Sequence, residues 1–258
     1  MESLFSFDLT IWELLLFVVV GIFTGIINTI AGSGSLLTLP IFIFICGLPP
    51  SVANATNRIG VVMQSGIATW TWFKKDPKVF KGAWKLLLSS SIGALLGSRI
   101  AVNLDETMMR YSIGILMFAM LVVLLFKPQK WLKDPLGDIK PDKPLTIFVL
   151  FVIGVYGGFL QAGVGVFLLA ALVLVGNYSL KNANAIKLLL VFAFTIPSLI
   201  LFFYYGKVHI GLGLLMGFFQ SIGAWLGVNF IAKMPNANTW IYRILIVVVA
   251  ISALKFFI

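Results

Sequence analysis

The chain has 258 residues, of which 60% are hydrophobic and only 11% are charged, and its mean hydropathy is +1.05. Soluble domains carry about 25% charged residues, so this composition excludes a soluble globular protein and predicts one embedded in lipid. The net charge of +10 does not indicate nucleic-acid binding, because the lysines lie in short runs between apolar stretches. One cysteine and one histidine exclude an intrachain disulfide and a thiolate or His-based metal site, so we expect no metal and no cofactor.

Ten apolar segments follow one another along the chain and predict an all-α, multi-pass membrane protein. They span residues 11–31, 36–46, 54–73, 83–102, 107–126, 145–161, 166–176, 184–205, 208–231 and 240–257. Most approach the ~20 residues with which a helix crosses about 30 Å of hydrocarbon. The first segment follows acidic residues and not a basic n-region, so we interpret it as a transmembrane helix and not as a signal peptide.

Two of these segments, 36–46 and 166–176, are only about half as long as the others and would extend over roughly 16 Å as helices. Each follows a glycine-containing break, Ala-Gly-Ser-Gly-Ser at 31–35 and Ala-Gly-Val-Gly-Val at 162–166. A long helix, a glycine break and a half-length helix predict a re-entrant hairpin or a discontinuous helix.

The two breaks belong to an internal repeat. The sequence SIGALLG at 91–97 recurs as SIGAWLG at 221–227, and six of the seven residues are identical. At the same offset, Asn54-Ala55 recurs as Asn184-Ala185. Gly21 and Gly25 match Gly154 and Gly158 after a small gap. The order of these matches predicts two related halves, residues 1–126 and 145–258, joined by a polar linker at 127–144.

The lysines predict the topology. One side of the membrane receives Lys74, Lys75, Lys78 and Lys81, the linker, and the loops at Lys181 and Lys233. This side should be cytoplasmic, which places both termini outside the cell (plasma or inner) membrane. Five segments per half is an odd number, so we expect two inverted-topology repeats. Inverted repeats whose broken helices meet near the midplane are typical of transporters.

Several stretches of the chain resemble those of a known family. The stretch 21–40, with NTIAGSGSLLTLP at 28–40, resembles the first conserved stretch of the sulfite exporter (TauE/SafE) family. The LPP turn at 48–50, the ANATNR sequence at 53–58 and both SIGAxLG stretches are also similar to that family. The resemblance covers both halves and implies export of small sulfur-containing anions such as sulfite, thiosulfate or organosulfonates. The second half departs from the first, because Ile186-Lys187-Leu188 replaces Thr56-Asn57-Arg58.

The breaks are the first part of the predicted substrate site. An anion at membrane depth needs donors, and backbone N–H groups at helix N-termini supply them. We expect the two breaks to converge and to offer these groups. The candidate residues are Ser33, Gly34, Ser35, Gly163, Val164, Gly165 and Val166. The alternative is that the glycines only allow close helix packing.

Two basic residues, Arg58 and Lys187, form the second part of the predicted site. Asn54, Asn57 and Arg58 share one helix face, and Asn184 and Lys187 repeat it. A basic group inside a membrane helix normally faces a cavity or a partner, although it can also snorkel to the interface. Neutral candidates complete the set: Asn28 and Gln161 precede the breaks, and Gln64, Thr195, Gln220 and Asn229 either line a pathway or join helices.

No Asp or Glu lies in the middle of a segment, so we expect transport without a carboxylate relay. We do not expect an intramembrane enzyme, because there is no zinc motif, no Asp pair and no Ser–His partnership. Two alternatives stay open: a transporter of another small anion or metabolite, and a membrane assembly factor that transports nothing. The sequence also leaves a homodimer open.

Overall fold

The computed structural model describes residues 10–125, 143–230 and 237–257, and every regular element in these ranges is a helix. The helices are α1 (Ile11–Ile30), α2 (Ser35–Pro40), α3 (Pro50–Lys75), α4 (Trp84–Val102), α5 (Glu106–Leu125), α6 (Pro144–Phe159), α7 (Val164–Leu174), α8 (Leu180–Tyr204), α9 (Ile210–Asn229) and α10 (Ala237–Phe257). A π-helical turn, η2 (Ile41–Ile45), extends α2, and a 3-10 turn, η3 (Pro77–Phe80), follows α3. The ten predicted segments are therefore confirmed, including the two short ones. The linker prediction lies almost wholly outside the described residues.

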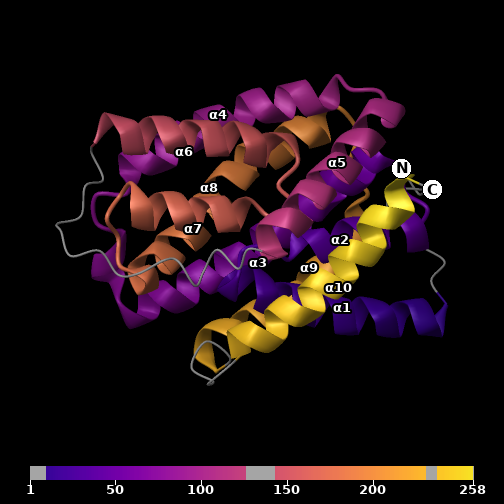
Figure 1. Cartoon of the computed structure of the whole chain (residues 1–258), viewed down its shortest axis with the longest axis horizontal. Helices are drawn as coiled ribbons and strands as arrows, with labels where there is room; N and C mark the ends of the chain where they lie inside the picture. The colour runs from indigo at the N-terminus through magenta and orange to yellow at the C-terminus, as the bar shows by residue number, and fades with distance from the viewer. Residues whose placement is uncertain (1–9, 126–142, 231–236, 258) are drawn as a thin grey trace.

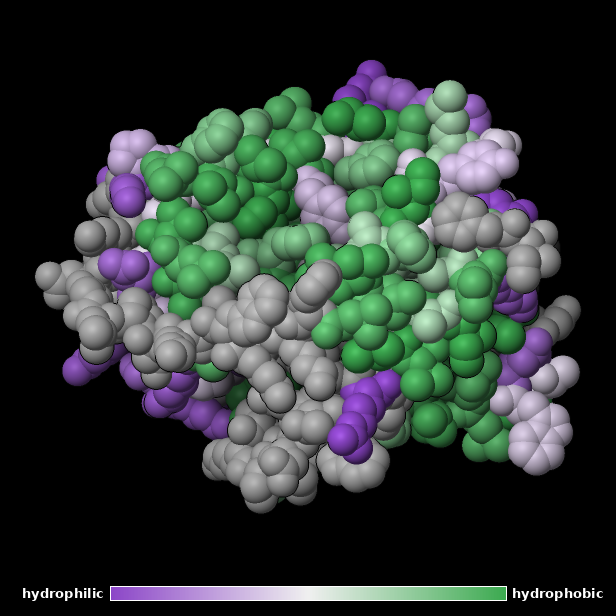
Figure 2. All heavy atoms as spheres, viewed as in Figure 1, coloured by the Kyte–Doolittle hydropathy of each residue, from purple (hydrophilic) through white to green (hydrophobic). Residues whose placement is uncertain are grey.

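The surface of the molecule fits a lipid environment. Five helices, α1, α4, α5, α8 and α9, are long and apolar enough to cross a membrane by their length and composition. Figure 2 shows a broad apolar surface between polar groups that gather mainly at the left and right ends. Large apolar side chains such as Trp12 and Ile200 are exposed on the molecule, which is the expected arrangement where the solvent is hydrocarbon.

Local signals explain where several helices begin. Thr10 and Glu13 form a capping box, in which each side chain bonds to the backbone N–H of the other residue. Pro50 occupies the first turn of α3, where a missing N–H has no cost. Ser179 accepts a hydrogen bond from the N–H of Asn182 and so caps α8.

Two helix pairs are packed through glycine, and they explain the repeated glycines of the sequence. α1 packs against α9, and α6 packs against α4. An added Cβ on Gly25 or Gly223 would collide with backbone atoms across the α1–α9 contact, and one on Gly97 or Gly158 would do so across the α4–α6 contact. Small residues four apart let membrane helices approach closely. In each pair, the first helix of one predicted half packs against the fourth helix of the other.

The two short helices point in opposite directions from the middle of the molecule. Figure 1 shows α2 toward the right-hand end and α7 toward the left-hand end, while α1 begins and α10 ends on the right. In addition, α3 packs against α8, and α5 packs against α10. The break between α1 and α2 and the break between α6 and α7 both lie near the centre of the molecule (Figure 1).

Replacing Gly158 by alanine should destabilise the fold, because the added Cβ would collide with backbone atoms of Ala94 on α4. Overpacking of this kind costs about 1–3 kcal/mol, which thermal unfolding of the purified variant would detect. Gly66→Ala is the matched control, since its added Cβ would meet only the movable ring of Phe192. Equal melting temperatures for the two variants would contradict this account of the α4–α6 contact.

Candidate functional site

The two glycine breaks are in direct contact. The N–H of Gly165 donates to the carbonyl oxygen of Gly32 at 3.0 Å, and a Cβ on either glycine would collide with the backbone of the other. Gly32 has a φ of +75° and Gly163 a φ of +71°, values that favour glycine. The expected convergence of the breaks is therefore present, and at this contact glycine is required both for close approach and for backbone conformation.

Most of the predicted backbone donors already have partners inside the protein. Four of the seven candidate residues donate their N–H groups to acceptors inside the protein in this conformation. The bonds run from Gly34 to Asn28 Oδ1 (2.8 Å), from Val164 to Gln161 O (3.3 Å), from Gly165 to Gly32 O (3.0 Å) and from Val166 to Gly163 O (3.0 Å). An anion could engage these four groups only by replacing bonds that the protein makes to itself.

Arg58 is fully buried at 0% exposure, so snorkelling to the membrane interface is wrong for this residue. Its guanidinium donates to the carbonyl oxygens of Gly157 at 3.2 Å and Gly158 at 2.6 Å, which lie in the last turn of α6. Asn54 donates to Phe159 O at 2.9 Å in the same turn. A helix C-terminus leaves carbonyls without intrahelical partners and carries partial negative charge, so Arg58 and Asn54 cap α6 where it breaks.

Lys187 performs the equivalent task for α1. Its ammonium, on a side chain that is 1% exposed, donates to the carbonyl oxygens of Asn28 (3.3 Å) and Thr29 (3.2 Å) and to Asn184 Oδ1 (2.6 Å). Snorkelling is therefore wrong for Lys187 as well. Each basic residue caps the broken helix of the other predicted half, which no single-helix pattern in the sequence reveals.

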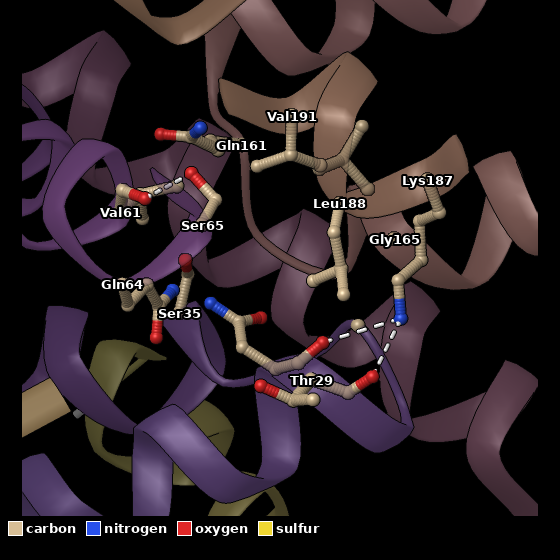
Figure 3. Close-up of a pocket in the computed structure, with 13 residues that line it drawn as sticks. Thr29, Ser35, Val61, Gln64, Ser65, Gln161, Gly165, Lys187, Leu188 and Val191 are labelled. Atoms are coloured by element: carbon tan, nitrogen blue, oxygen red, sulfur yellow. Dashed lines mark hydrogen bonds between the residues drawn. The ribbon is translucent and has the colours of Figure 1, made fainter. Parts of the chain in front are cut away.

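A small cavity lies beside the contact between the breaks (Figure 3). Its volume is about 20 Å³, room for little more than one water molecule. Six of the predicted site residues line it: Asn28, Ser35, Gln161, Val164, Gly165 and Lys187. The other predicted residues of the breaks and of the α3 face do not line it: Ser33, Gly34, Asn54, Asn57, Arg58, Gly163 and Val166.

The sequence singled out Gln64 only as a pathway residue and missed other parts of the lining. The additional lining residues are Thr29, Gly32, Val61, Ser65, Leu188 and Val191. A signal for part of this set existed, because Asn54, Arg58, Val61 and Gln64-Ser65 follow one another at spacings of three and four on α3. Extending the predicted polar face by two turns would have included them.

Several buried amides near the breaks are incompletely paired. Within the described ranges, Gln64 Oε1, Gln161 Oε1 and both polar atoms of Gln220 have no hydrogen-bond partner. Gln161 Nε2 does donate to Thr195 Oγ1 at 2.5 Å. An unpaired buried polar group costs about 1–3 kcal/mol. A polar solute in the cavity could satisfy Gln64 and Gln161, which line it, whereas Gln220 does not.

The acidic residues of the described chain do not line this cavity. Glu106 lies at the start of α5, where it accepts from the N–H of Ser51 at 2.9 Å and pairs with Lys207 at 3.4 Å. Among the described residues, no group of three or more His, Cys, Asp or Glu side chains could hold a metal ion. The cavity therefore has one formal charge in its lining, the cation of Lys187.

Comparison with known proteins decides the family. A family model described as sulfite exporter TauE/SafE matches residues 17–256. The chain belongs to the TauE/SafE family. Relatives of this TauE/SafE protein include probable membrane transporter protein ORF9 of Sinorhizobium, which is 30% identical over 93% of this chain and 91% of that protein.

Two further relatives carry similar names. A probable membrane transporter protein of Haemophilus influenzae is 28% identical over 83% of this chain and 82% of that protein. The probable membrane transporter protein YfcA of Escherichia coli is 27% identical over 98% of this chain and 92% of that protein. No solved structure matches the chain. This TauE/SafE protein is thus a multi-pass membrane transporter, as the resemblance implied.

Arg58→Met should lower the stability of the purified protein, because it removes the donors to Gly157 and Gly158 at the end of α6. The expected loss is about 1–3 kcal/mol for each carbonyl left without a partner. Arg110→Met is the matched control, since Arg110 is exposed on α5. Thermal unfolding in detergent compares the two variants, and a shared melting temperature would refute the capping role of Arg58.

Proposed function

We propose that this TauE/SafE protein transports small sulfur-containing anions, such as sulfite, thiosulfate or organosulfonates, out of the cell. The observation that carries the proposal is the contact between Gly32 and Gly165 beside a fully buried lysine. Two interrupted helices meet there, and the cavity at their junction holds a cation and no carboxylate. Family membership supports a transporter, and the electrostatics of this junction support an anion as its substrate.

The charge at the junction favours an anion for two reasons. Lys187 lies in the cavity wall and cannot be screened by bulk water at 1% exposure. The start of α7, an eleven-residue helix, lies in the same wall at Val164 and Gly165, so the positive end of its dipole faces the same space. A cation in this cavity would be repelled by Lys187 and by the positive end of α7, and no carboxylate in the lining would attract it.

We infer that this conformation is closed. A volume of about 20 Å³ is far below the ~300 Å³ and more of typical ligand pockets, so a polyatomic anion would require the two hairpins to separate. The close pairs α1–α9 and α4–α6 are held by glycine contacts, and each would move as a unit. We propose that the two halves are inverted repeats, so that opening toward one side mirrors opening toward the other.

Export needs no coupling ion in this scheme. Moving one negative charge out of a cell with an interior at −100 mV gains about 2.3 kcal/mol. That energy supports roughly fifty-fold accumulation outside for a monoanion. The absence of acidic residues from the cavity lining agrees with transport that uses no protein-borne proton carrier.

Lys187→Gln should reduce anion flux by about ten-fold or more, because it removes the cation of the cavity wall. Flux of radiolabelled sulfite and thiosulfate into proteoliposomes containing the purified protein provides the measurement. Lys181→Gln is the matched control, as Lys181 is exposed on the same helix, and it should keep wild-type flux. Wild-type vesicles that move none of these anions would reject the proposed function.

The proposed orientation places Lys78 in the cytoplasm and Tyr204 outside, and both are exposed. A membrane-impermeant maleimide added to intact cells should therefore label Tyr204→Cys and not Lys78→Cys. Both variants also carry Cys46→Ser, so that the introduced thiol is the only one in the chain. The opposite labelling pattern would reverse the proposed topology.

A further inference from the structure

Both halves contribute a buried base near the junction, but only one of the two bases lines the cavity described above. Lys187 lines the cavity and Arg58 does not. The ring of Phe202 packs against Arg58, with its centroid 4.6 Å from the guanidinium carbon. In the second half Lys187 stands at the position of Asn57 and Leu188 at that of Arg58, and this departure from the first half coincides with a difference in which buried base lines the cavity.

Asn28 presents a fixed donor at this cavity. Its Oδ1 accepts a hydrogen bond from the N–H of Gly34 at 2.8 Å, which fixes which end of the amide is the oxygen. The NH₂ end is therefore the end left for another partner. Asn28 also lines the cavity and is only partly buried. Its backbone carbonyl is held by Lys187, so the residue is positioned from both sides.

Gln64 presents a second, adjustable amide. Its side chain is 2% exposed, and Oε1 has no partner among the described residues. No hydrogen bond to that oxygen fixes the amide, so it can turn either end to a ligand. Figure 3 shows Gln64 close to Ser35 on one side of the cavity, with Lys187 on the opposite side. Polar groups from α1, α3 and α8 therefore surround one small space.

We propose that Asn28 and Gln64 are the specificity-determining donors of the transporter, and that each chain binds one anion, on the Lys187 side of the junction. The amide NH₂ groups would bind the oxygens of a sulfite or sulfonate group while Lys187 balances its charge. Arg58 is a structural cap with no substrate contact. The inference rests on the proposed function and adds the residues and the stoichiometry.

This arrangement also defines the class of substrate. Two amides on different helices can bind separate oxygens of one oxyanion, whereas a halide offers a single acceptor atom. A site built to hydrogen-bond its ligand discriminates strongly against a ligand that leaves its buried groups unpaired. The binding order should accordingly be small oxyanions of sulfur above chloride.

Asn28→Asp is the decisive variant. The aspartate keeps an oxygen for the N–H of Gly34, but it replaces the donor to the anion by a second acceptor with negative charge. Binding of sulfite, thiosulfate and sulfoacetate to the purified protein, measured by calorimetry, should weaken by about ten-fold or more. The melting temperature without anion should stay close to that of the wild type. Asn103→Asp adds the same charge at an exposed position and should bind as the wild type does.

Gln64→Leu gives an independent test, since it removes an amide without adding a charge and should also weaken binding. If the wild type binds an anion and both variants bind it within two-fold, the inference is overturned while the proposed function stands. Two anions per chain would likewise overturn it. If the wild type neither binds nor transports any of the three anions, the proposed function fails, and this inference fails with it.

Discussion

The structure depends on how backbone carbonyls at the ends of two broken helices find partners inside a membrane. Lipid offers no hydrogen bonds, so an interrupted helix at membrane depth must have its terminal groups satisfied by protein. Arg58 does this for α6 and Lys187 for α1. In both cases the base comes from a helix of the other half. The carbonyls at the end of one helix thus receive their hydrogen bonds from a side chain more than ninety residues away in sequence.

This capping also sets the electrostatics of the junction. Each break brings the negative end of a long helix close to the positive end of a short one. The buried bases compensate the negative ends, and the positive ends remain at the contact between Gly32 and Gly165. Arginine can engage several carbonyls of α6 at once because its guanidinium is a fixed fork of donors. The smaller ammonium of Lys187 leaves room for a cavity beside it.

The sequence predicted the fold in considerable detail because its signals are local. Apolar runs, lysine-rich turns and glycine breaks each act over a few residues, and the observed helices follow the predicted segments closely. The partners of Arg58 and Lys187 could not be predicted in the same way. Apart from Asn184 Oδ1, which bonds to Lys187, they are backbone carbonyls, which every residue carries and no motif marks. The packing of Phe202 against Arg58 is likewise a property of the assembled helices.

The glycine contact between α1 and α9 has a consequence for biosynthesis. Gly25 reaches its final environment only when the backbone of Gln220 and Ala224 is present. A ribosome adds about 5–20 residues per second, so α1 enters the membrane roughly 10–40 s before its partner exists. During that time its small-residue face is covered by lipid or by the insertion machinery, and the last helices to emerge must displace that cover to complete the fold.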